Sequence, residues 1–246
     1  MTRIRARSLS VALVAALVVS ACGGDDDADD AADEPAATVA DVDDTDTTVA
    51  QATFDGPVST LPPDLPEEYV GAVGPMDIEG EPLPVLETDD IDADPAVGTP
   101  APTILGVGFD GVPVRIDAAA DGPTMVVVLA HWCPHCNAEI PVYNDLRDEG
   151  RFPEQLNIIA LSTSPDPSRP NFPPDEWLVE KDWTYPAIAD GVDPAASPPW
   201  LGAGALGVSG FPFVTLIDGD GNVAARWSGE QDPDWIIETI ETSLGL

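Results

Sequence analysis

The stretch VVVLAHWCPHCNAEIP, residues 126–141, decides how this chain folds. It opens with an apolar, mostly β-branched run, which favours a buried strand, and a helical pattern follows directly after Cys136. Two residues separate Cys133 from Cys136, and this spacing at a strand-to-helix junction is typical of thiol–disulfide exchange. The free N–H groups and the dipole at a helix start favour a thiolate at Cys133.

The first residues have the pattern of an export signal. Three arginines within the first seven residues precede an apolar run over residues 9–19, which is short for a membrane span. The run ends in VSAC at residues 19–22, which resembles the lipobox of bacterial lipoproteins. We therefore expect residues 1–21 to be a lipoprotein signal peptide and Cys22 to carry a thioether-linked lipid. A plain secretory peptide with a spare cysteine is the alternative.

The chain has three cysteines, an odd number for an exported protein. If Cys22 is lipidated, Cys133 and Cys136 remain as the only redox pair, and no cysteine is left for structural disulfides. We therefore expect a fold held by its core, in a compartment where disulfides persist. The redox-active Cys133–Cys136 pair then needs no separate cofactor.

The charge of the chain excludes some partners. The formal net charge is −36 at pH 7, and residues 22–100 contain 23 acidic residues but no Lys or Arg. Phosphate repels such a surface, so nucleic acid is not an expected partner. Anionic lipid would not hold the protein by charge either, so we expect a lipid anchor to keep it at the membrane.

Composition divides the rest of the chain into three parts. Residues 22–53 are acidic and small, which predicts a disordered tether; calcium binding is disfavoured because the EF-hand spacing is absent. Residues 54–97 hold seven prolines between positions 57 and 84, which predicts a linker whose short apolar pieces can pack as a strap. From about residue 98 the composition is globular, so residues 98–246 form the predicted domain.

The order of elements in this domain predicts a mixed α/β sheet covered on both faces. The expected strands and helices are a hairpin over 101–114 with an Asp-Gly turn, the strand and helix around the cysteines, a strand at 156–161, a short helix from 173, a strand at 183–189, a hairpin over 213–227, and a final helix capped by Asp232. A proline- and glycine-rich crossing fills the interval up to residue 206.

At this point the chain resembles the thioredoxin fold, and within it the exported TlpA/ResA-like disulfide oxidoreductases. The resemblance covers roughly residues 98–246. It rests on WCPHC at 132–136, EIP at 139–141, GVSGFP at 207–212 and LIDGDGNV at 216–223. It implies an α/β, thioredoxin-like fold with a mixed central sheet flanked by helices and an N-terminal hairpin extension.

The resemblance also implies roles for individual residues. Cys133 would form the mixed disulfide with a substrate and Cys136 would resolve it. Pro212 would be cis and lie beside the cysteines, leaving a strand edge open for an extended peptide. Glu139 matches a family position and can exchange a proton with Cys136, although it can equally be an exposed helix residue.

Two further residues belong to the same motif. His135 can stabilise the Cys133 thiolate, which makes the disulfide more oxidising, and Trp132 is expected to shape the rim of the site. The expected partners are exported cysteine-containing proteins and a membrane redox partner that recharges the pair. The expected location is extracytoplasmic, at the bacterial cell membrane.

The direction of exchange stays open in the sequence. Cys-Pro-His-Cys is the setting of DsbA-type oxidases, whereas the surrounding sequence looks like TlpA-type reductases, which we favour slightly. A copper- or zinc-binding module using His131, Cys133, His135 and Cys136 is a third interpretation. A thiol peroxidase is disfavoured by the paired cysteines, and a lipoprotein with an inert CxxC is a further alternative.

Overall fold

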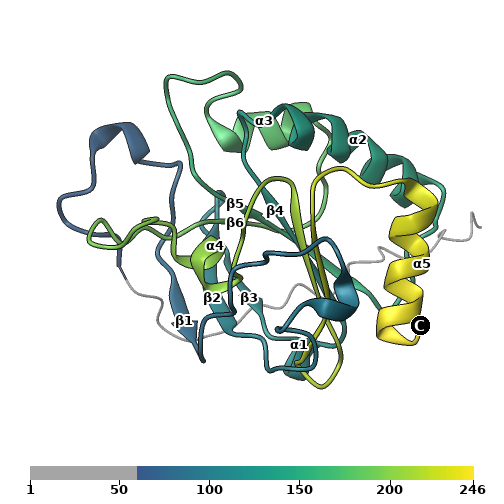
Figure 1. Cartoon of the computed structure of the whole chain (residues 1–246). Coiled ribbons are helices and arrows are strands. Elements are labelled where there is room, and N and C mark those ends of the chain that lie inside the picture. The colour runs from purple at the N-terminus through teal and green to yellow at the C-terminus, as the bar shows by residue number, and fades with distance from the viewer. Residues whose placement is uncertain (1–59) are drawn as a thin grey trace, which may run out of the picture. The chain divides into compact units, whose positions relative to one another are not determined.

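The computed structural model of the chain describes residues 60–246 (Figure 1). The predicted signal peptide, Cys22 and the acidic tether lie outside the described residues. The described part is built around one mixed β-sheet. This confirms the mixed α/β sheet predicted from the order of the elements.

Eight strands form the sheet in the order β1-β2-β6-β5-β4-β7-β8, with β3 paired to β2. The strands are Asp77–Glu79 (β1), Thr103–Gly108 (β2), Pro113–Ile116 (β3), Thr124–Leu129 (β4), Asn157–Ser162 (β5), Ala187–Ala189 (β6), Phe213–Ile217 (β7) and Val223–Ser228 (β8). Strands β4, β5 and β6 are parallel, whereas β7 runs antiparallel to both β4 and β8. The antiparallel β2–β3 pair is the predicted N-terminal hairpin.

Strand β4 lies at the centre because it can bury both of its faces. All six of its residues are buried. Met125 and Val127 point into one hydrophobic core, and Val126 and Val128 point into the other. A continuous apolar run is the pattern of a strand covered on both sides. The strand therefore fixes the position of the cysteines that follow it.

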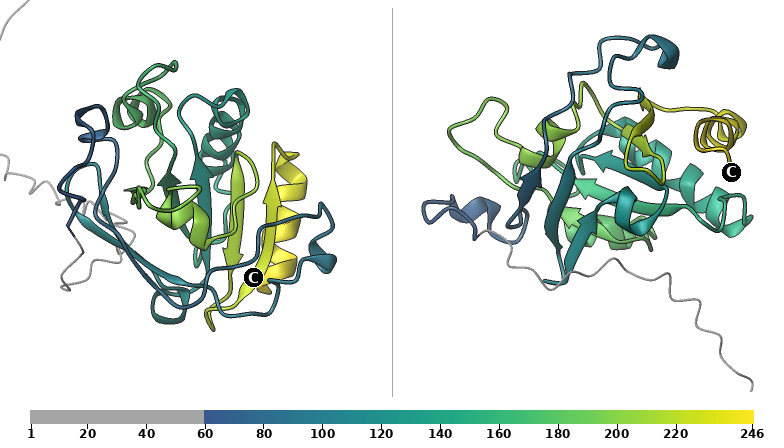
Figure 2. Two further views of the ribbon diagram at one scale, coloured as in Figure 1. Left: turned by 60° about the vertical axis from the view of Figure 1, so that its left-hand side comes forward. Right: turned by 90° about the horizontal axis from the view of Figure 1, so that it is seen from below.

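The three longer helices cover one face of the sheet, which holds the larger core, and two short helices contribute to the core on the other face. The α-helices are Ala118–Asp121 (α1), Pro134–Asp148 (α2), Pro174–Glu180 (α3), Leu201–Ala205 (α4) and Pro233–Leu244 (α5), with 3-10 turns at Glu67–Tyr69 and Ile91–Ala93. Apolar residues of α2, α3 and α5 pack together on the sheet. The ribbons of these helices beside the sheet can be followed in Figure 2. The sequence did not predict α4, which lies in the crossing before β7.

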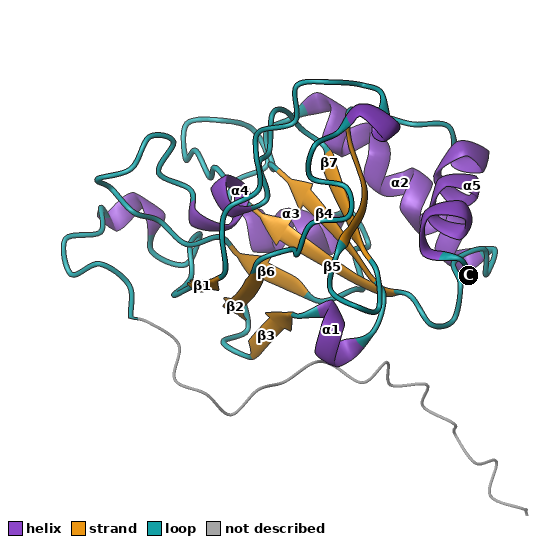
Figure 3. Ribbon diagram, turned by 60° about the horizontal axis from the view of Figure 1, so that its bottom comes forward, coloured by secondary structure: helices purple, strands orange, loops and turns teal. Residues whose placement is uncertain are grey.

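Extended chain covers much of the opposite face, across which loops run in Figure 3. We call residues 76–96 the strap. It contributes β1, which pairs with β2, and four buried apolar side chains, Met76, Leu83, Leu86 and Ala96. Composition places the start of the domain at residue 98, whereas the strap belongs to the same core. Its prolines prevent a helix but permit an extended backbone that needs few N–H donors.

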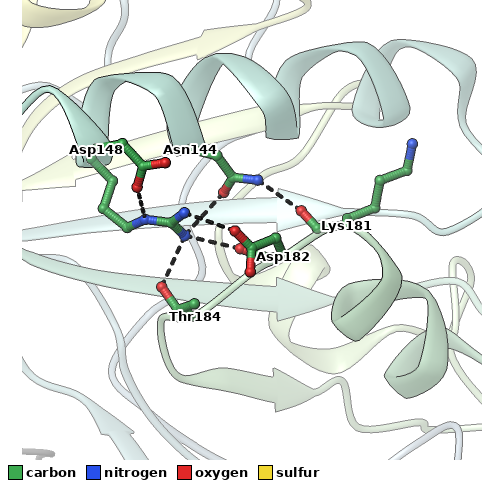
Figure 4. A network of polar contacts seen from close by, with 6 residues as sticks. Asn144, Asp148, Lys181, Asp182 and Thr184 are labelled. Carbon is green, nitrogen blue, oxygen red and sulfur yellow. Dashed lines mark hydrogen bonds and ion pairs between the residues drawn. The ribbon is translucent and has the colours of Figure 1, made fainter. Parts of the chain in front are cut away.

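Arg147 ties the end of α2 to the chain after α3 (Figure 4). Its guanidinium donates hydrogen bonds to Asp148 Oδ1 at 2.8 Å, Asn144 Oδ1 at 3.3 Å, Thr184 Oγ1 at 3.0 Å, Asp182 O at 2.9 Å and Asp182 Oδ2 at 3.0 Å. This network holds α2 against the connection to β6. The helix that carries the cysteines is therefore anchored at its far end.

Candidate active site

The two cysteines lie where β4 passes into α2. Cys133 is the residue before the first helical residue and has extended backbone angles, and Pro134 occupies the first helical position. Proline suits this position because its missing N–H would have no partner within the helix. Cys136 follows in the first turn. Both cysteines are free thiols in this structure.

The surroundings of the two sulfurs differ. Cys136 has no exposed surface, and the N–H of Ala130 lies 3.5 Å from its Sγ. Burial raises the pKa of the Cys136 thiol far above its usual range, although the N–H of Ala130 opposes this effect. Cys133 keeps a small exposed area, and its Sγ donates to the carbonyl oxygen of Phe211 at 3.5 Å. The pair is therefore asymmetric.

Pro212 lies beside this pair. The Phe211–Pro212 peptide bond is cis, as the resemblance implies for this position, and β7 begins at the next residue. The carbonyl oxygen of Phe211 accepts the hydrogen bond from the Cys133 thiol. The ring of Phe211 packs edge-on against that of Trp132, with the ring centroids 5.9 Å apart. Phe211 and Trp132 thus flank the more accessible sulfur.

Trp132 is half-buried and held by a loop after β5. Its indole N–H donates to the carbonyl of Ser164 at 2.7 Å, and the guanidinium of Arg169 lies over its ring, 4.7 Å from the centroid. We call residues 163–173 the rim loop. Its closeness to the cysteines has no signal in the sequence, because more than thirty residues separate it from Trp132.

His131 is fully buried and turned toward the rim loop. Its Nδ1 lies 2.8 Å from the carbonyl of Pro170, and its Nε2 accepts the N–H of Asp166 at 3.0 Å. These two partners define a neutral ring with its proton on Nδ1. Burial lowers the pKa of His131, against the effect of the Pro170 carbonyl. His131 therefore holds the loop.

Asn137 is a second anchor that sequence reasoning missed. Its amide nitrogen donates to the carbonyls of His131 at 3.1 Å and Cys133 at 2.9 Å. Its side-chain oxygen accepts the indole N–H of Trp177, from α3, at 3.0 Å. Asn171 of the rim loop adds a bond to the His131 carbonyl at 2.9 Å. The turn that carries the cysteines is thus fixed on the α3 side.

His135, between the cysteines, is exposed and bound on the opposite side. Its Nδ1 lies 2.5 Å from Oε1 of Glu230, which belongs to the loop between β8 and α5. The N–H of Gly229, in the same loop, donates to the carbonyl of Pro212 at 2.8 Å. This loop therefore links the start of α2 to the cis-proline. Glu230 was not identified from the sequence, where it lies among many other acidic residues.

Glu139 is buried rather than exposed, with 1% of its surface accessible. Burial raises its pKa to about 7, although the N–H of Gln231, 3.4 Å from Oε1, opposes this effect. Nearby Tyr143 is fully buried, and its hydroxyl faces Glu139, where it also opposes the effect of burial on the pKa of that carboxyl group. Glu139 and Cys136 are close enough for the carboxylate to disfavour the thiolate. A carboxyl group that titrates near neutrality therefore lies beside the buried thiol.

The four side chains considered as metal ligands do not converge. His131 uses both ring nitrogens on the rim loop, and Nδ1 of His135 is bound to Glu230. Within residues 60–246 no group of three or more His, Cys, Asp or Glu side chains is arranged to hold a metal ion.

In the same range, no helix is both long and apolar enough to cross a membrane.

Comparisons with known proteins agree with this geometry. The profile of the Redoxin family matches residues 96–244. The thiol:disulfide interchange protein CycY of Rhizobium leguminosarum bv. viciae is 30% identical over 141 residues, which cover 54% of this chain and 67% of CycY. The thiol:disulfide interchange protein DsbE of Escherichia coli K12 is 29% identical over 141 residues, which cover 56% of this chain and 68% of DsbE.

Solved structures with a similar arrangement have lower identity. A putative thiol:disulfide interchange protein DsbE from Chlorobium tepidum is 20% identical, with a TM-score of 0.47, and covers 61% of this chain and 98% of that one. StoA from Bacillus subtilis is 17% identical, with a TM-score of 0.43, and the match covers 59% of this chain and 98% of StoA. The Redoxin profile, in contrast, covers more than half of the chain, including both cysteines and Pro212. The chain therefore belongs to the Redoxin family, and it is a thiol–disulfide oxidoreductase with a thioredoxin-like fold.

Proposed function

We propose that this protein exchanges disulfides with exported cysteine-containing proteins through Cys133 and Cys136, on the outer side of the bacterial cell membrane. One observation carries the proposal: the two thiols have unequal surroundings. Cys133 lies at the start of α2 beside the cis-proline and keeps a small exposed area, whereas Cys136 lies in the first turn of α2 and is fully buried. The more accessible sulfur meets the partner, and the buried sulfur completes the reaction.

In the reducing direction, the Cys133 thiolate attacks one sulfur of a partner disulfide. A bond forms between Cys133 and the partner, and the other partner sulfur leaves as a thiolate and takes up a proton. Cys136 then loses its proton and attacks Cys133 Sγ, which releases the second partner sulfur. Two electrons have passed to the partner, and the protein holds a Cys133–Cys136 disulfide.

Glu139 is suited to take the proton from Cys136 in the second step. Its pKa of about 7 lets the carboxyl group both accept and release a proton at neutral pH. The thiol of Cys136, whose pKa is raised by burial, needs such a base before it can attack. The buried position of Glu139, one turn into α2, supports this role.

We favour the reductase direction, because the sequence around the cysteines looks like the TlpA-type reductases. A DsbA-like oxidase is the second candidate, and the histidine between the cysteines favours it. The protein would then hold the disulfide at rest and pass it to reduced partners. Reducing or oxidising equivalents would come from a membrane redox partner.

The proposed anchor is a lipid on Cys22, preceded by the signal peptide and followed by the acidic tether. A Cys22→Ser variant expressed in a bacterial host tests this part, with incorporation of a labelled fatty acid as the readout. The wild type should carry the label and the variant should not. A variant labelled as strongly as the wild type would overturn lipid anchoring through Cys22.

The exchange function is tested with a Cys136→Ser variant, which cannot resolve the mixed disulfide. We expect covalent adducts of exported proteins on Cys133, visible on non-reducing gels and removed by reductant. Cys133→Ser is the matched control and should trap none. Absence of adducts would sink the mechanism. Mass spectrometry of the adducts also gives the direction, since a few cytochrome-assembly partners indicate a reductase and many newly exported proteins an oxidase.

A further inference from the structure

Positive charge is scarce in this protein, which has nine basic residues against 45 acidic ones. Within residues 60–246, four of the six basic side chains are bound to carboxylates. These ion pairs are Arg115–Asp121, Arg147 with Asp148 and Asp182 (Figure 4), Arg151–Asp234 and Arg226–Asp94. Lys181 donates to the carbonyl of Asn137 at 3.4 Å. Arg169 is the arginine of the described part that has no carboxylate within 4.0 Å.

Arg169 lies at the edge of the catalytic site. Its guanidinium rests on the ring of Trp132, the residue that precedes Cys133. Trp132 packs on Phe211, whose carbonyl accepts the Cys133 thiol. Three successive contacts therefore connect the guanidinium to the reacting sulfur. Arg169 is an exposed residue, so a molecule that reaches Cys133 can also reach it.

The rim loop holds Arg169 in place before any partner arrives. His131 binds the loop on both sides of the arginine, at the N–H of Asp166 and the carbonyl of Pro170. The indole N–H of Trp132 donates to the carbonyl of Ser164 in the loop. The side chain of Asn171, also in the loop, donates to the carbonyl of His131 in the turn before the cysteines. A cation on a loop that is anchored in this way, with its guanidinium resting on Trp132, loses less freedom when it binds than a cation on an unanchored loop.

The carboxylate closest along the loop, that of Asp166, interacts with Arg169 through space but forms no ion pair with it, and takes its hydrogen bonds from Ser168. It accepts the hydroxyl of Ser168 at 2.6 Å and the N–H of Ser168 at 2.9 Å, and these bonds lower the pKa of Asp166. A guanidinium that stacks on an aromatic ring with one face keeps the N–H groups at its edge free. Those groups match the two oxygens of a carboxylate.

We propose that Arg169 is a specificity residue that binds an Asp or Glu side chain of the partner polypeptide, close in sequence to the partner's reacting cysteine. This inference rests on the exchange function proposed above and names a feature of its substrates. The loop between β8 and α5 supports a defined orientation of the partner, because Glu230 in that loop is a carboxylate, bound to His135. A partner would place its acidic side chain toward the rim loop and away from Glu230.

The test uses the reduced mature protein and three peptides that differ only beside their single cysteine, carrying Glu, Gln or Lys. The peptides are acetylated and amidated, so that only the side chain supplies a carboxylate. Each cysteine is blocked as a mixed disulfide with 2-mercaptoethanol, and the rate of exchange with Cys133 is measured by quenched flow and mass spectrometry. The readout is the ratio of the rates for the Glu and Gln peptides within each variant.

We expect the wild type to prefer the Glu peptide over the Gln peptide by about three- to tenfold at low salt, with a smaller ratio at high salt. Arg169→Gln should bring this ratio to about one, and Arg169→Lys should retain part of it. Arg151→Gln is the matched control, because Arg151 pairs with Asp234 in the first turn of α5, so its loss should leave the preference intact.

A wild-type ratio of one, or an unchanged ratio in Arg169→Gln, would overturn the assignment of Arg169 while the exchange function stands. A preference that is lost equally in Arg151→Gln would also overturn it, since net charge alone would then explain the effect. If none of the three peptides reacts with Cys133, both the exchange function and the assignment fail.

Discussion

Arg226 on β8 holds Asp94 of the strap with two hydrogen bonds, from Nε to Oδ2 at 2.8 Å and from Nη2 to Oδ1 at 2.6 Å. Neither side chain is exposed. The remaining nitrogen, Nη1, donates to the carbonyls of Pro84 at 2.8 Å and Leu206 at 2.9 Å. One arginine thus fastens the strap at two points and also holds the segment that leads to Pro212.

The charge of this pair should be essential for the strap. Burial alone would raise the pKa of Asp94, but the hydrogen bonds from Arg226 and from the N–H of Ala96 outweigh it, and the pKa is lowered. Asp94→Asn leaves Arg226 buried without a counter-charge, so we expect a loss of about 3–5 kcal/mol in the free energy of unfolding in urea. Asp148→Asn, in an exposed pair, should cost less than ~1 kcal/mol. Equal losses in the two variants would contradict this account.

Two nearby glycines give a test of how closely the strap packs. Gly207 has φ +67°, and a Cβ there would lie 2.2 Å from the carbonyl oxygen of Pro84. Gly207→Ala therefore combines a strained backbone with a backbone clash, and we expect a loss of about 3 kcal/mol or more. Gly204→Ala, in open space on α4, should instead be neutral or stabilise by ~0.5–1 kcal/mol. Thermal unfolding of the two variants distinguishes these outcomes.

The parts that the sequence predicted are those encoded by neighbouring residues. The strand before Cys133, the helix after it and the hairpins with their Asp-Gly turns are local patterns, and the structure contains them. The five-residue helix α4 was missed because two of its residues are glycine, which weakens any helical pattern. A Cβ at Gly202 would lie 2.9 Å from the buried side chain of Leu161, so the glycine lets α4 pack closely against β5.

Partners distant in sequence could not be predicted. Glu230 meets His135 across 95 residues, and Asp94 meets Arg226 across 132, in a chain where acidic residues outnumber basic ones fivefold. Each basic residue thus had many possible acidic partners, and only the packed fold selects one. His131 illustrates the same limit, because next to two cysteines it suggested a metal ligand while its actual partners are backbone groups of the rim loop.

His135 should set the reduction potential through the Cys133 thiolate. His135 lies between the two cysteines in the sequence, and its exposed imidazole is bound to Glu230. Removing it by His135→Ala takes away a group that stabilises the thiolate, so the disulfide should become less oxidising by about 30 mV, a tenfold change in the equilibrium constant. Equilibration with glutathione measures this shift. Glu238→Gln on α5 is the control, and a potential that stays the same or rises in His135→Ala would refute the role.

Glu139 should make the stability of the reduced protein depend on pH. Its pKa is about 7 in the folded chain, against an ordinary value of 4.5, because burial disfavours the carboxylate and Glu230 adds to this effect. Between these two pH values the folded state binds the proton more tightly than the unfolded state does. The stabilising contribution is therefore complete below pH 4.5 and is lost as the pH rises through 7.

Comparison with Glu139→Gln isolates this contribution, since Asp190, whose pKa burial raises to about 6, is present in both proteins. From pH 4.5 to pH 8 the wild type should lose about 3 kcal/mol more unfolding free energy than the variant, as urea titrations of the reduced proteins would show. Parallel pH dependences would mean that Glu139 titrates normally. The same carboxyl group would then lack the pKa needed to accept the proton of Cys136, and the rate of mixed-disulfide resolution should show no inflection near pH 7. A resolution rate that does inflect there, and loses the inflection in Glu139→Gln, ties the buried acid to the chemistry of the thiol beside it.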